Sequence, residues 1–75
     1  MPKTWDDPLL RKVGHRIRRL RGQRGFSQEA LADMVGIDRT YMSGIERGLR
    51  NLSVLKLRDV SRALKVPIRT LLADD

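Results

Sequence analysis

Residues 27–48, SQEALADMVGIDRTYMSGIERG, constrain the fold more than any other stretch of this 75-residue chain. Two sets of apolar residues recur there at helical spacing, namely Ala30, Leu31, Met34 and Val35, then Ile37, Met42 and Ile45. Ser27 and Asp38 precede the sets as N-caps, whose side-chain oxygens accept hydrogen bonds from free backbone N–H groups. Gly36 and Gly48 follow them, and glycine ends a helix in the left-handed conformation without steric cost. The stretch therefore predicts a helix, a short turn and a second helix, which is the helix-turn-helix arrangement.

Helical patterns also precede and follow this motif. Asp7 and Pro8 mark the start of a first helix, because a proline at the first helical position loses no hydrogen bond. Ser53 caps a fourth helix, and Pro67 begins a short fifth one. The residues of these last two helices that we expect to face the core are Val54, Leu57, Val60, Ser61, Leu64, Leu71 and part of Leu72. The prediction is an all-α, five-helix domain over residues 8–75, preceded by a short arm at residues 1–7.

The composition favours a polyanionic partner, because the formal net charge is +7 and the sequence pI is about 11.1. The chain has no cysteine, which excludes disulfides and thiolate metal sites and fits a reducing cytoplasm. No apolar run approaches membrane-spanning length, and the first ten residues lack signal-peptide character, so we expect a cytoplasmic protein. The aromatic residues Trp5, Phe26 and Tyr41 are too few for a base-stacking platform on single strands.

The first helix is strongly basic, and no Asp or Glu occurs from Pro8 to Gln28. Its basic residues are Arg11, Lys12, Arg16, Arg18, Arg19, Arg21 and Arg24. Such a run is usually a solvated face, and a basic amphipathic helix also suits an anionic membrane surface. Because the apolar face lacks an aromatic anchor, we favour a core-packed helix whose polar flank approaches DNA phosphate. Gly14 and Gly22 each weaken this helix by about 1 kcal/mol relative to alanine, so tertiary packing must hold it.

The motif resembles the lambda-repressor-like (Cro/XRE) helix-turn-helix family. The matching apolar positions are Leu31, Val35, Ile37, Met42 and Ile45. Ala32 matches the family's small residue at the helix crossing, and Gly36 matches its turn glycine. The resemblance implies a compact DNA-binding domain, and the run DRTYMSGIERGLRNLS is most similar to the short controller proteins of bacterial restriction–modification systems.

The candidates for contact with bases are the outward-facing residues of the second motif helix. They are Arg39, Thr40, Ser43 and Gly44, with Tyr41 as a further candidate. Arg39 can bond bidentately to guanine, the Thr40 methyl can pack on thymine, and Gly44 would let the backbone approach the groove. The resemblance implies that the first four positions meet base edges. A plain surface arginine remains the alternative for Arg39, as does a covering role for the Tyr41 ring.

The candidates for contact with phosphate are Gln28, Arg47, Arg50 and Asn51. Gln28 carries a long amide beside the positive N-terminus of a helix, and the family places a glutamine there for this purpose. The resemblance also implies that Arg21 and Glu46 form a structural salt bridge between the first and third helices. Removal of one partner of such a pair leaves the other without its counter-charge.

These features predict a sequence-specific transcriptional regulator that binds double-stranded DNA as a homodimer on a palindromic operator. A domain this small makes few base contacts, and two-fold symmetry doubles them. The controller resemblance implies autoregulation of a restriction–modification operon, with activation at low concentration and repression at high concentration through cooperative dimers. Phage-type repressors and antitoxins share most of the motif and remain alternatives. So does an RNA-binding or protein-interaction module with the same fold.

Two surface patches are candidates for protein partners. Glu29 and Asp33 lie one helical turn apart, and the resemblance implies that these positions contact RNA polymerase in related activators. Compensation of the helix dipole by Glu29, beside an ordinary surface Asp33, is the alternative. The apolar residues that the predicted core leaves unused are Leu52, Leu55, Val66 and Ile68, and we expect them to form the dimer interface.

Catalysis is not predicted. His15 is the sole histidine and has no cysteine or carboxylate cluster at ligand spacing, so we expect no metal site. The sequence contains no phosphate-cradling glycine loop and no nucleophile–base pairing. We therefore expect neither an enzyme nor a bound cofactor.

Overall fold

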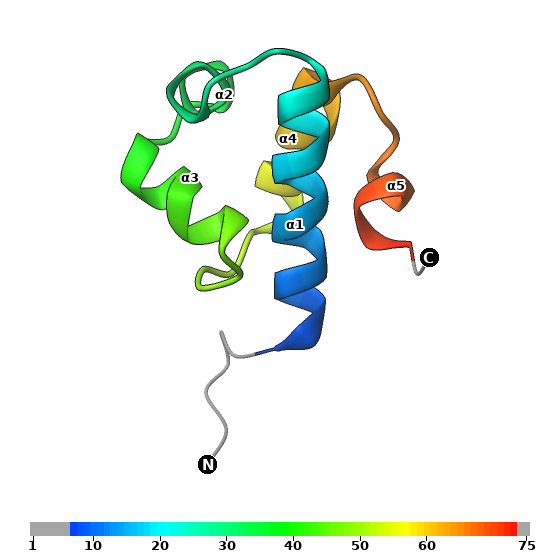
Figure 1. Cartoon of the computed structure of the whole chain (residues 1–75). Helices are drawn as coiled ribbons and strands as arrows, with labels where there is room; N and C mark the ends of the chain where they lie inside the picture. The colour runs from blue at the N-terminus through cyan, green and yellow to red at the C-terminus, as the bar shows by residue number, and fades with distance from the viewer. Residues whose placement is uncertain (1–6, 74–75) are drawn as a thin grey trace.

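The computed structural model describes residues 7–73, which form five α-helices. They are α1 (Pro8–Gln23), α2 (Gln28–Val35), α3 (Arg39–Glu46), α4 (Val54–Leu64) and α5 (Ile68–Leu72). The helix α1 runs through the middle of the domain, with α3 packed on one side of it and α5 on the other (Figure 1). This arrangement confirms the all-α, five-helix prediction, and α2 and α3 are the two helices of the predicted motif.

The predicted caps set the helix boundaries. Residues 1–6 of the predicted arm lie outside the described residues, whereas Asp7 caps α1 by accepting a 2.8 Å hydrogen bond from the backbone N–H of Leu9. The side chains of Ser27, Asp38 and Ser53 each accept from the N–H three residues later, at 2.7 to 3.0 Å. The first motif helix ends at Gly36, which has a φ of 74°. These local bonds redirect the chain so that α3 can pack across α2.

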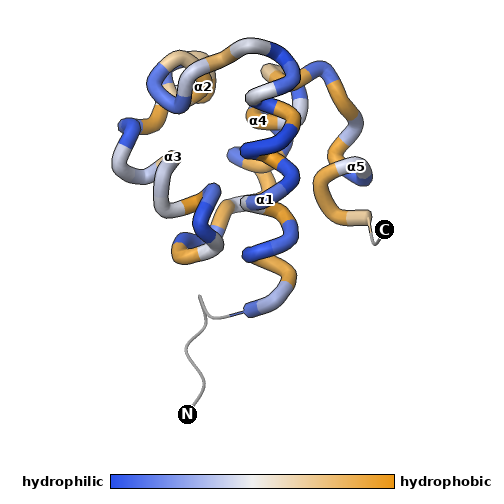
Figure 2. The backbone as a smooth tube through the Cα atoms, in the orientation of Figure 1, coloured by the Kyte–Doolittle hydropathy of each residue, from blue (hydrophilic) through white to orange (hydrophobic). Residues whose placement is uncertain are grey.

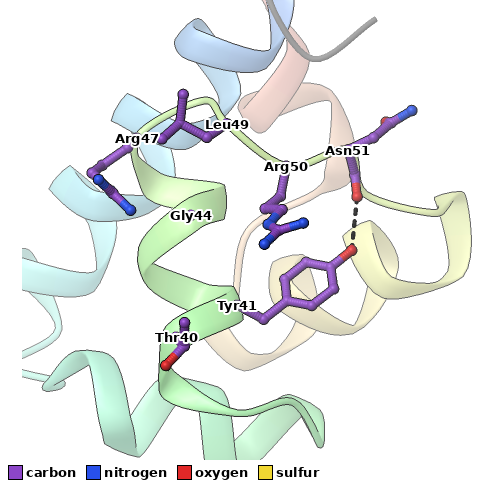
Figure 3. Close-up of a pocket in the computed structure, with 7 residues that line it drawn as sticks. All are labelled: Thr40, Tyr41, Gly44, Arg47, Leu49, Arg50 and Asn51. Atoms are coloured by element: carbon purple, nitrogen blue, oxygen red, sulfur yellow. Dashed lines mark hydrogen bonds between the residues drawn. The ribbon is translucent and has the colours of Figure 1, made fainter.

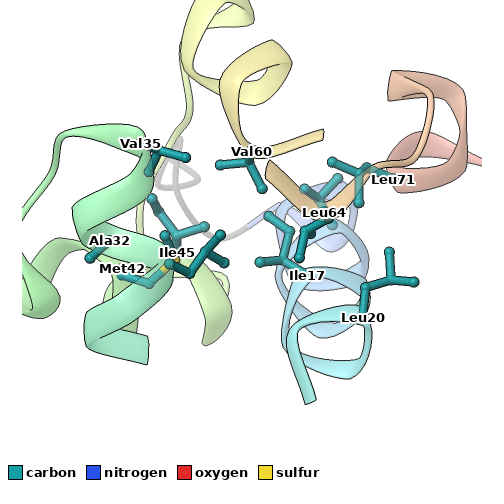
Figure 4. Close-up of a cluster of buried hydrophobic side chains, with 11 residues drawn as sticks. Ile17, Leu20, Ala32, Val35, Met42, Ile45, Val60, Leu64 and Leu71 are labelled. Atoms are coloured by element: carbon teal, nitrogen blue, oxygen red, sulfur yellow. The ribbon is translucent and has the colours of Figure 1, made fainter. Parts of the chain in front are cut away.

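The hydrophobic core lies between α1, the two motif helices and the C-terminal pair α4 and α5 (Figure 4). Its buried side chains are Val13, Ile17, Leu20, Leu31, Ala32, Val35, Met42, Ile45, Val60, Leu64 and Leu71. Hydrophobic and hydrophilic residues alternate along the turns of α1, so one face of that helix meets the core (Figure 2). None of the helices in residues 7–73 has the length and apolar character needed to cross a membrane.

Four apolar placements differ from the sequence-based prediction. Met34 and Val54 fall on apolar faces by spacing, yet they are 52% and 76% exposed. Leu52 and Val66 are predicted to lie outside the core, yet both are half-buried and pack against it. The reason is that spacing identifies a face but not its width or its length. Met34 lies to one side of the α2 face that Leu31, Ala32 and Val35 bury, and Val54 is the first residue of α4. The loops that flank α4 fold over the core.

Gly14 marks the point where α1 crosses α3. A Cβ atom built on Gly14 would lie 2.2 Å from the carbonyl oxygen of Ile45 and 2.7 Å from that of Glu46. A Cβ atom built on Gly22 would meet nothing within 4 Å. The sequence treats both glycines alike as weak points of one helix. In the folded chain, Gly14 instead permits the close approach that places α3 on α1.

Candidate nucleic-acid interface

A buried ion pair fixes the orientation of α3. The Glu46 side chain is 1% exposed, and both of its carboxylate oxygens accept hydrogen bonds from Arg21, at 2.6 and 3.0 Å. Arg21 also donates to the carbonyl oxygen of Phe26 at 2.8 Å. The hydrogen bond to Glu46 raises the pKa of Arg21 above its ordinary value, with the Glu46 charge adding to this effect and burial opposing it. The predicted salt bridge between the first and third helices is therefore present, and Arg21 loses its charge only in strongly alkaline solution.

Gln28 also bonds to Glu46, and this additional contact is not predicted from the sequence. Its amide nitrogen donates to the Glu46 carboxylate at 3.1 Å, so the first residue of α2 is tied to the last residue of α3. A primary amide has two N–H donors, and this bond occupies one of them. The second donor is left for an acceptor such as a phosphate oxygen, which is the role predicted for Gln28.

The outer face of α3 carries most of the residues predicted to contact bases. Arg39, Thr40 and Tyr41 are exposed, and Ser43 is half-buried. Three grooves follow this face, and the largest has a volume of about 480 Å³. That groove is lined by Thr40, Tyr41, Gly44, Arg47, Leu49, Arg50 and Asn51 (Figure 3). The grooves bring the predicted base-contact and phosphate-contact residues together on one surface.

Gly44 lies on the outer face of α3, where it lines the largest groove, but it is covered. The side chain of Arg50 lies over it, so Gly44 is buried. A Cβ atom on Gly44 would be 2.7 Å from Cγ of Arg50. Arg50 follows the end of α3 in the sequence, but the loop after α3 folds so that the Arg50 side chain lies against Gly44.

Tyr41 holds the loop that follows α3. Its hydroxyl donates a 2.8 Å hydrogen bond to the carbonyl oxygen of Asn51, as the dashed line in Figure 3 marks. The N–H of Leu49 also donates to the carbonyl oxygen of Gly44 at 2.9 Å. Residues 49–51 are thus tied to α3 at both ends, which keeps Arg50 beside the helix.

Uncompensated positive charge gathers on this surface. Arg39, Arg47 and Arg50 are exposed, and none of them forms an ion pair within residues 7–73. On α4, by contrast, basic side chains are paired with an acidic one: Asp59 lies 3.7 Å from Lys56 and 3.2 Å from Arg58. The face of α3 is therefore suited to an anionic partner supplied from outside.

The basic flank of α1 is less uniform than the sequence predicts. Arg16 is buried, Arg21 is paired with Glu46, and Arg24 donates to the carbonyl oxygen of Leu64 at 2.9 Å. Arg18 and Arg19 are exposed. Part of this positive charge therefore serves packing and capping inside the domain.

Lys56 contributes to the motif although no local pattern singles it out. Its ammonium group donates a 2.6 Å hydrogen bond to the carbonyl oxygen of Val35, at the last residue of α2. A cation at that position interacts favourably with the helix dipole. The two residues are far apart in the sequence, so the contact arises only when α4 packs on α2.

The acidic side chains of α2 lie at the surface. Glu29 and Asp33 are both exposed, in the positions that the sequence predicts for them. Within the part of the chain that the structure describes, no three His, Cys, Asp or Glu side chains are grouped so that they could hold a metal ion.

Comparison with known proteins identifies related chains of similar size. The control protein C.MunI of a Mycoplasma species is 36% identical over 64 residues, which cover 84% of this chain and 86% of that protein. The crystal structure of the restriction-modification controller protein C.AhdI from Aeromonas hydrophila matches with a TM-score of 0.79. It is 45% identical and covers 83% of this chain and 94% of the other.

A third similar protein was crystallised on DNA. The master regulator for biofilm formation SinR, in complex with DNA, matches with a TM-score of 0.77 and 40% identity, over 81% of this chain and 98% of that one. The family model described as helix-turn-helix matches residues 17–71, which include both motif helices. The ordering of α2 and α3, the buried Arg21–Glu46 pair and these matches all agree, and the chain belongs to the helix-turn-helix family.

Proposed function

We propose that this protein is a sequence-specific transcriptional regulator that binds double-stranded DNA through α3, as a homodimer on a palindromic operator in the cytoplasm. The observation that carries the proposal is the exposed face of α3, where Arg39, Arg47 and Arg50 have no ion-pair partner within residues 7–73. The similarity to SinR, which was crystallised in complex with DNA, supports DNA as the partner.

The finer proposal is that the protein controls a restriction–modification operon and its own gene. It rests on the similarity to the control protein C.MunI and to the controller protein C.AhdI. The proposed mechanism has two dimers per operator, which would allow activation at low concentration and repression at high concentration.

We assign base contact to Arg39, Thr40, Ser43 and Tyr41, and phosphate contact to a second set consisting of Gln28, Arg47, Arg50 and Asn51. Base contacts carry the specificity, whereas phosphate contacts fix the register of the protein on the duplex. The exposed position of Arg39 in the first turn of α3 suits a bidentate bond to a guanine edge in the major groove.

Arg39→Ala is expected to weaken operator binding by about 1–3 kcal/mol and to relax the preference at one guanine in each half-site. Selection of binding sites from random duplexes measures both effects. Arg69→Ala is the matched control, because Arg69 is exposed on α5, which lies on the opposite side of α1 from α3 (Figure 1). An unchanged base preference in the Arg39 variant would remove this residue from the set of base contacts.

The alternative function is RNA binding or protein interaction with the same fold. It predicts that the wild-type chain selects no duplex sequence, or that RNA competes for the same surface at equal concentration. A gel shift with the selected duplex and an RNA competitor distinguishes these functions. The exposed, unpaired Arg39 favours duplex binding over both alternatives.

We further propose that Glu29 and Asp33 form an activation patch for RNA polymerase. Both residues are exposed on α2. Glu29 lines one of the grooves beside Gln28 and Arg39, whereas Asp33 lies outside all three, and the position of Asp33 supports a partner other than DNA. Compensation of the α2 dipole by Glu29 is the competing explanation.

Reversal of both charges, Glu29→Lys with Asp33→Lys, is expected to abolish activation in a reporter assay while operator binding is kept. A patch for RNA polymerase requires this separation, because its charges act on a protein surface rather than on DNA. Activation that persists in the double variant would leave dipole compensation as the role of Glu29.

A further inference from the structure

Gly44 and Arg50 form a contact that the proposed function does not yet explain. Gly44 lies in the middle of α3, and a Cβ atom built there would approach Cγ, Nε and Cδ of Arg50 at 2.7, 3.5 and 3.6 Å. Figure 3 shows the Arg50 side chain between the α3 ribbon at Gly44 and the ring of Tyr41. Any residue other than glycine would occupy the space that the Arg50 stem fills.

The backbone of Arg50 has little freedom to retreat from a larger residue. The N–H of Leu49 is bonded to the carbonyl oxygen of Gly44 at 2.9 Å, and the carbonyl oxygen of Asn51 accepts from the Tyr41 hydroxyl at 2.8 Å. These bonds fix the residues on both sides of Arg50. A methyl group at position 44 would therefore displace the side chain of Arg50 and leave the loop in place.

The guanidinium of Arg50 is oriented by packing. Within residues 7–73 it makes no hydrogen bond and no ion pair, and the residue is exposed. A long side chain without a polar partner samples many rotamers unless its stem is confined. The space above Gly44 supplies that confinement, on the face of α3 that the grooves follow.

We propose that Gly44 is a positioning residue for DNA binding, because its missing side chain seats the Arg50 stem on α3 and so directs the guanidinium toward the duplex. This inference rests on the proposed function. It assigns to Gly44 an effect that is transmitted through Arg50, in place of a direct approach of the helix backbone to the bases.

A double-mutant cycle tests this coupling in the full chain. The variants are Gly44→Ala, Arg50→Ala and the double substitution, with affinity measured for a selected operator and for an unrelated duplex over a range of salt concentrations. Gly44→Ala and Arg50→Ala are each expected to weaken binding to both duplexes about 10-fold and to lower the salt slope by about one. In the Arg50→Ala background, Gly44→Ala should cause no further loss.

Gly22→Ala is the matched control, because a Cβ atom there meets nothing within 4 Å. It should raise the Tm and leave binding unchanged. Thermal unfolding of every variant shows whether the chain remains folded. If Gly44→Ala alone is unstable, the double variant, which lacks the clash with the Arg50 side chain, can still be compared with Arg50→Ala.

Two results would overturn the inference. An equal loss of affinity from Gly44→Ala in both backgrounds would mean that the added methyl group meets DNA itself. Unchanged affinity in the Gly44→Ala variant would mean that Arg50 does not depend on the space above Gly44 for its contact with DNA. The wild-type chain separates this inference from the proposed function. If it bound no duplex at all, the proposed function would fail, whereas either of the two results above, with wild-type binding intact, would overturn this inference alone.

Discussion

Gly14→Ala is expected to lower the free energy of unfolding by about 3 kcal/mol, at the upper end of what overpacking a core costs. The new Cβ atom would lie 2.2 Å from the Ile45 carbonyl oxygen and 2.7 Å from that of Glu46. Both are backbone atoms at the end of α3, so no side-chain rotation relieves the contact. The helix must move away from α1, which also strains the bond between Arg21 and Glu46.

Chemical denaturation of the purified variant measures this loss. Gly22→Ala makes the same change in the same helix without a neighbour, and is expected to stabilise the domain by up to about 1 kcal/mol. The two substitutions should therefore shift the denaturation midpoint in opposite directions. Equal stabilisation by both would mean that α1 and α3 can separate at no cost, contrary to the packing at Gly14.

The second large effect is expected from Val54→Glu combined with Leu55→Glu, which should give a folded monomer with operator affinity reduced at least about 100-fold. Val54 and Leu55 are 76% and 64% exposed in the first turn of α4, which makes them the most exposed large hydrophobic side chains of the described residues. We propose that Val54 and Leu55 form the centre of the dimer interface. Leu55 and Ile68 are kept from the predicted set, and Val54 is added to it. Leu52 and Val66 are less suitable for this role, because both pack on the core.

A two-fold axis at this interface would place the two α3 helices in successive major grooves, about 34 Å apart. A monomer reaches only one half-site, so specific affinity falls while weak salt-dependent binding remains. Analytical ultracentrifugation measures the loss of the dimer, and a gel shift measures the loss of operator binding.

Leu9→Glu is the matched control, because Leu9 is an exposed leucine at the start of α1. It should leave the dimer intact. If the α4 double variant still sediments as a dimer and Leu9→Glu does not, the interface lies on α1 instead of α4.

Features that depend only on neighbouring residues follow from the amino-acid sequence alone. Ser27, Gly36 and Asp38 define the motif because capping bonds and the left-handed turn involve atoms only a few residues apart. The apolar spacing correctly assigns Ile17, Leu31 and Met42 to the core, since each lies in the central part of its helix. The family pattern likewise predicts the pairing of Arg21 with Glu46.

The extent of each apolar face, and the atoms that lie opposite each small residue, depend on how the helices pack. Spacing alone places Val54 inside, although no neighbouring element reaches the first turn of α4 closely enough to cover it. It likewise cannot separate Gly14 from Gly22, or show that Arg50 returns over Gly44. Each of these outcomes depends on atoms brought together from distant segments, and helical periodicity carries information about the direction of a side chain but none about what it meets there.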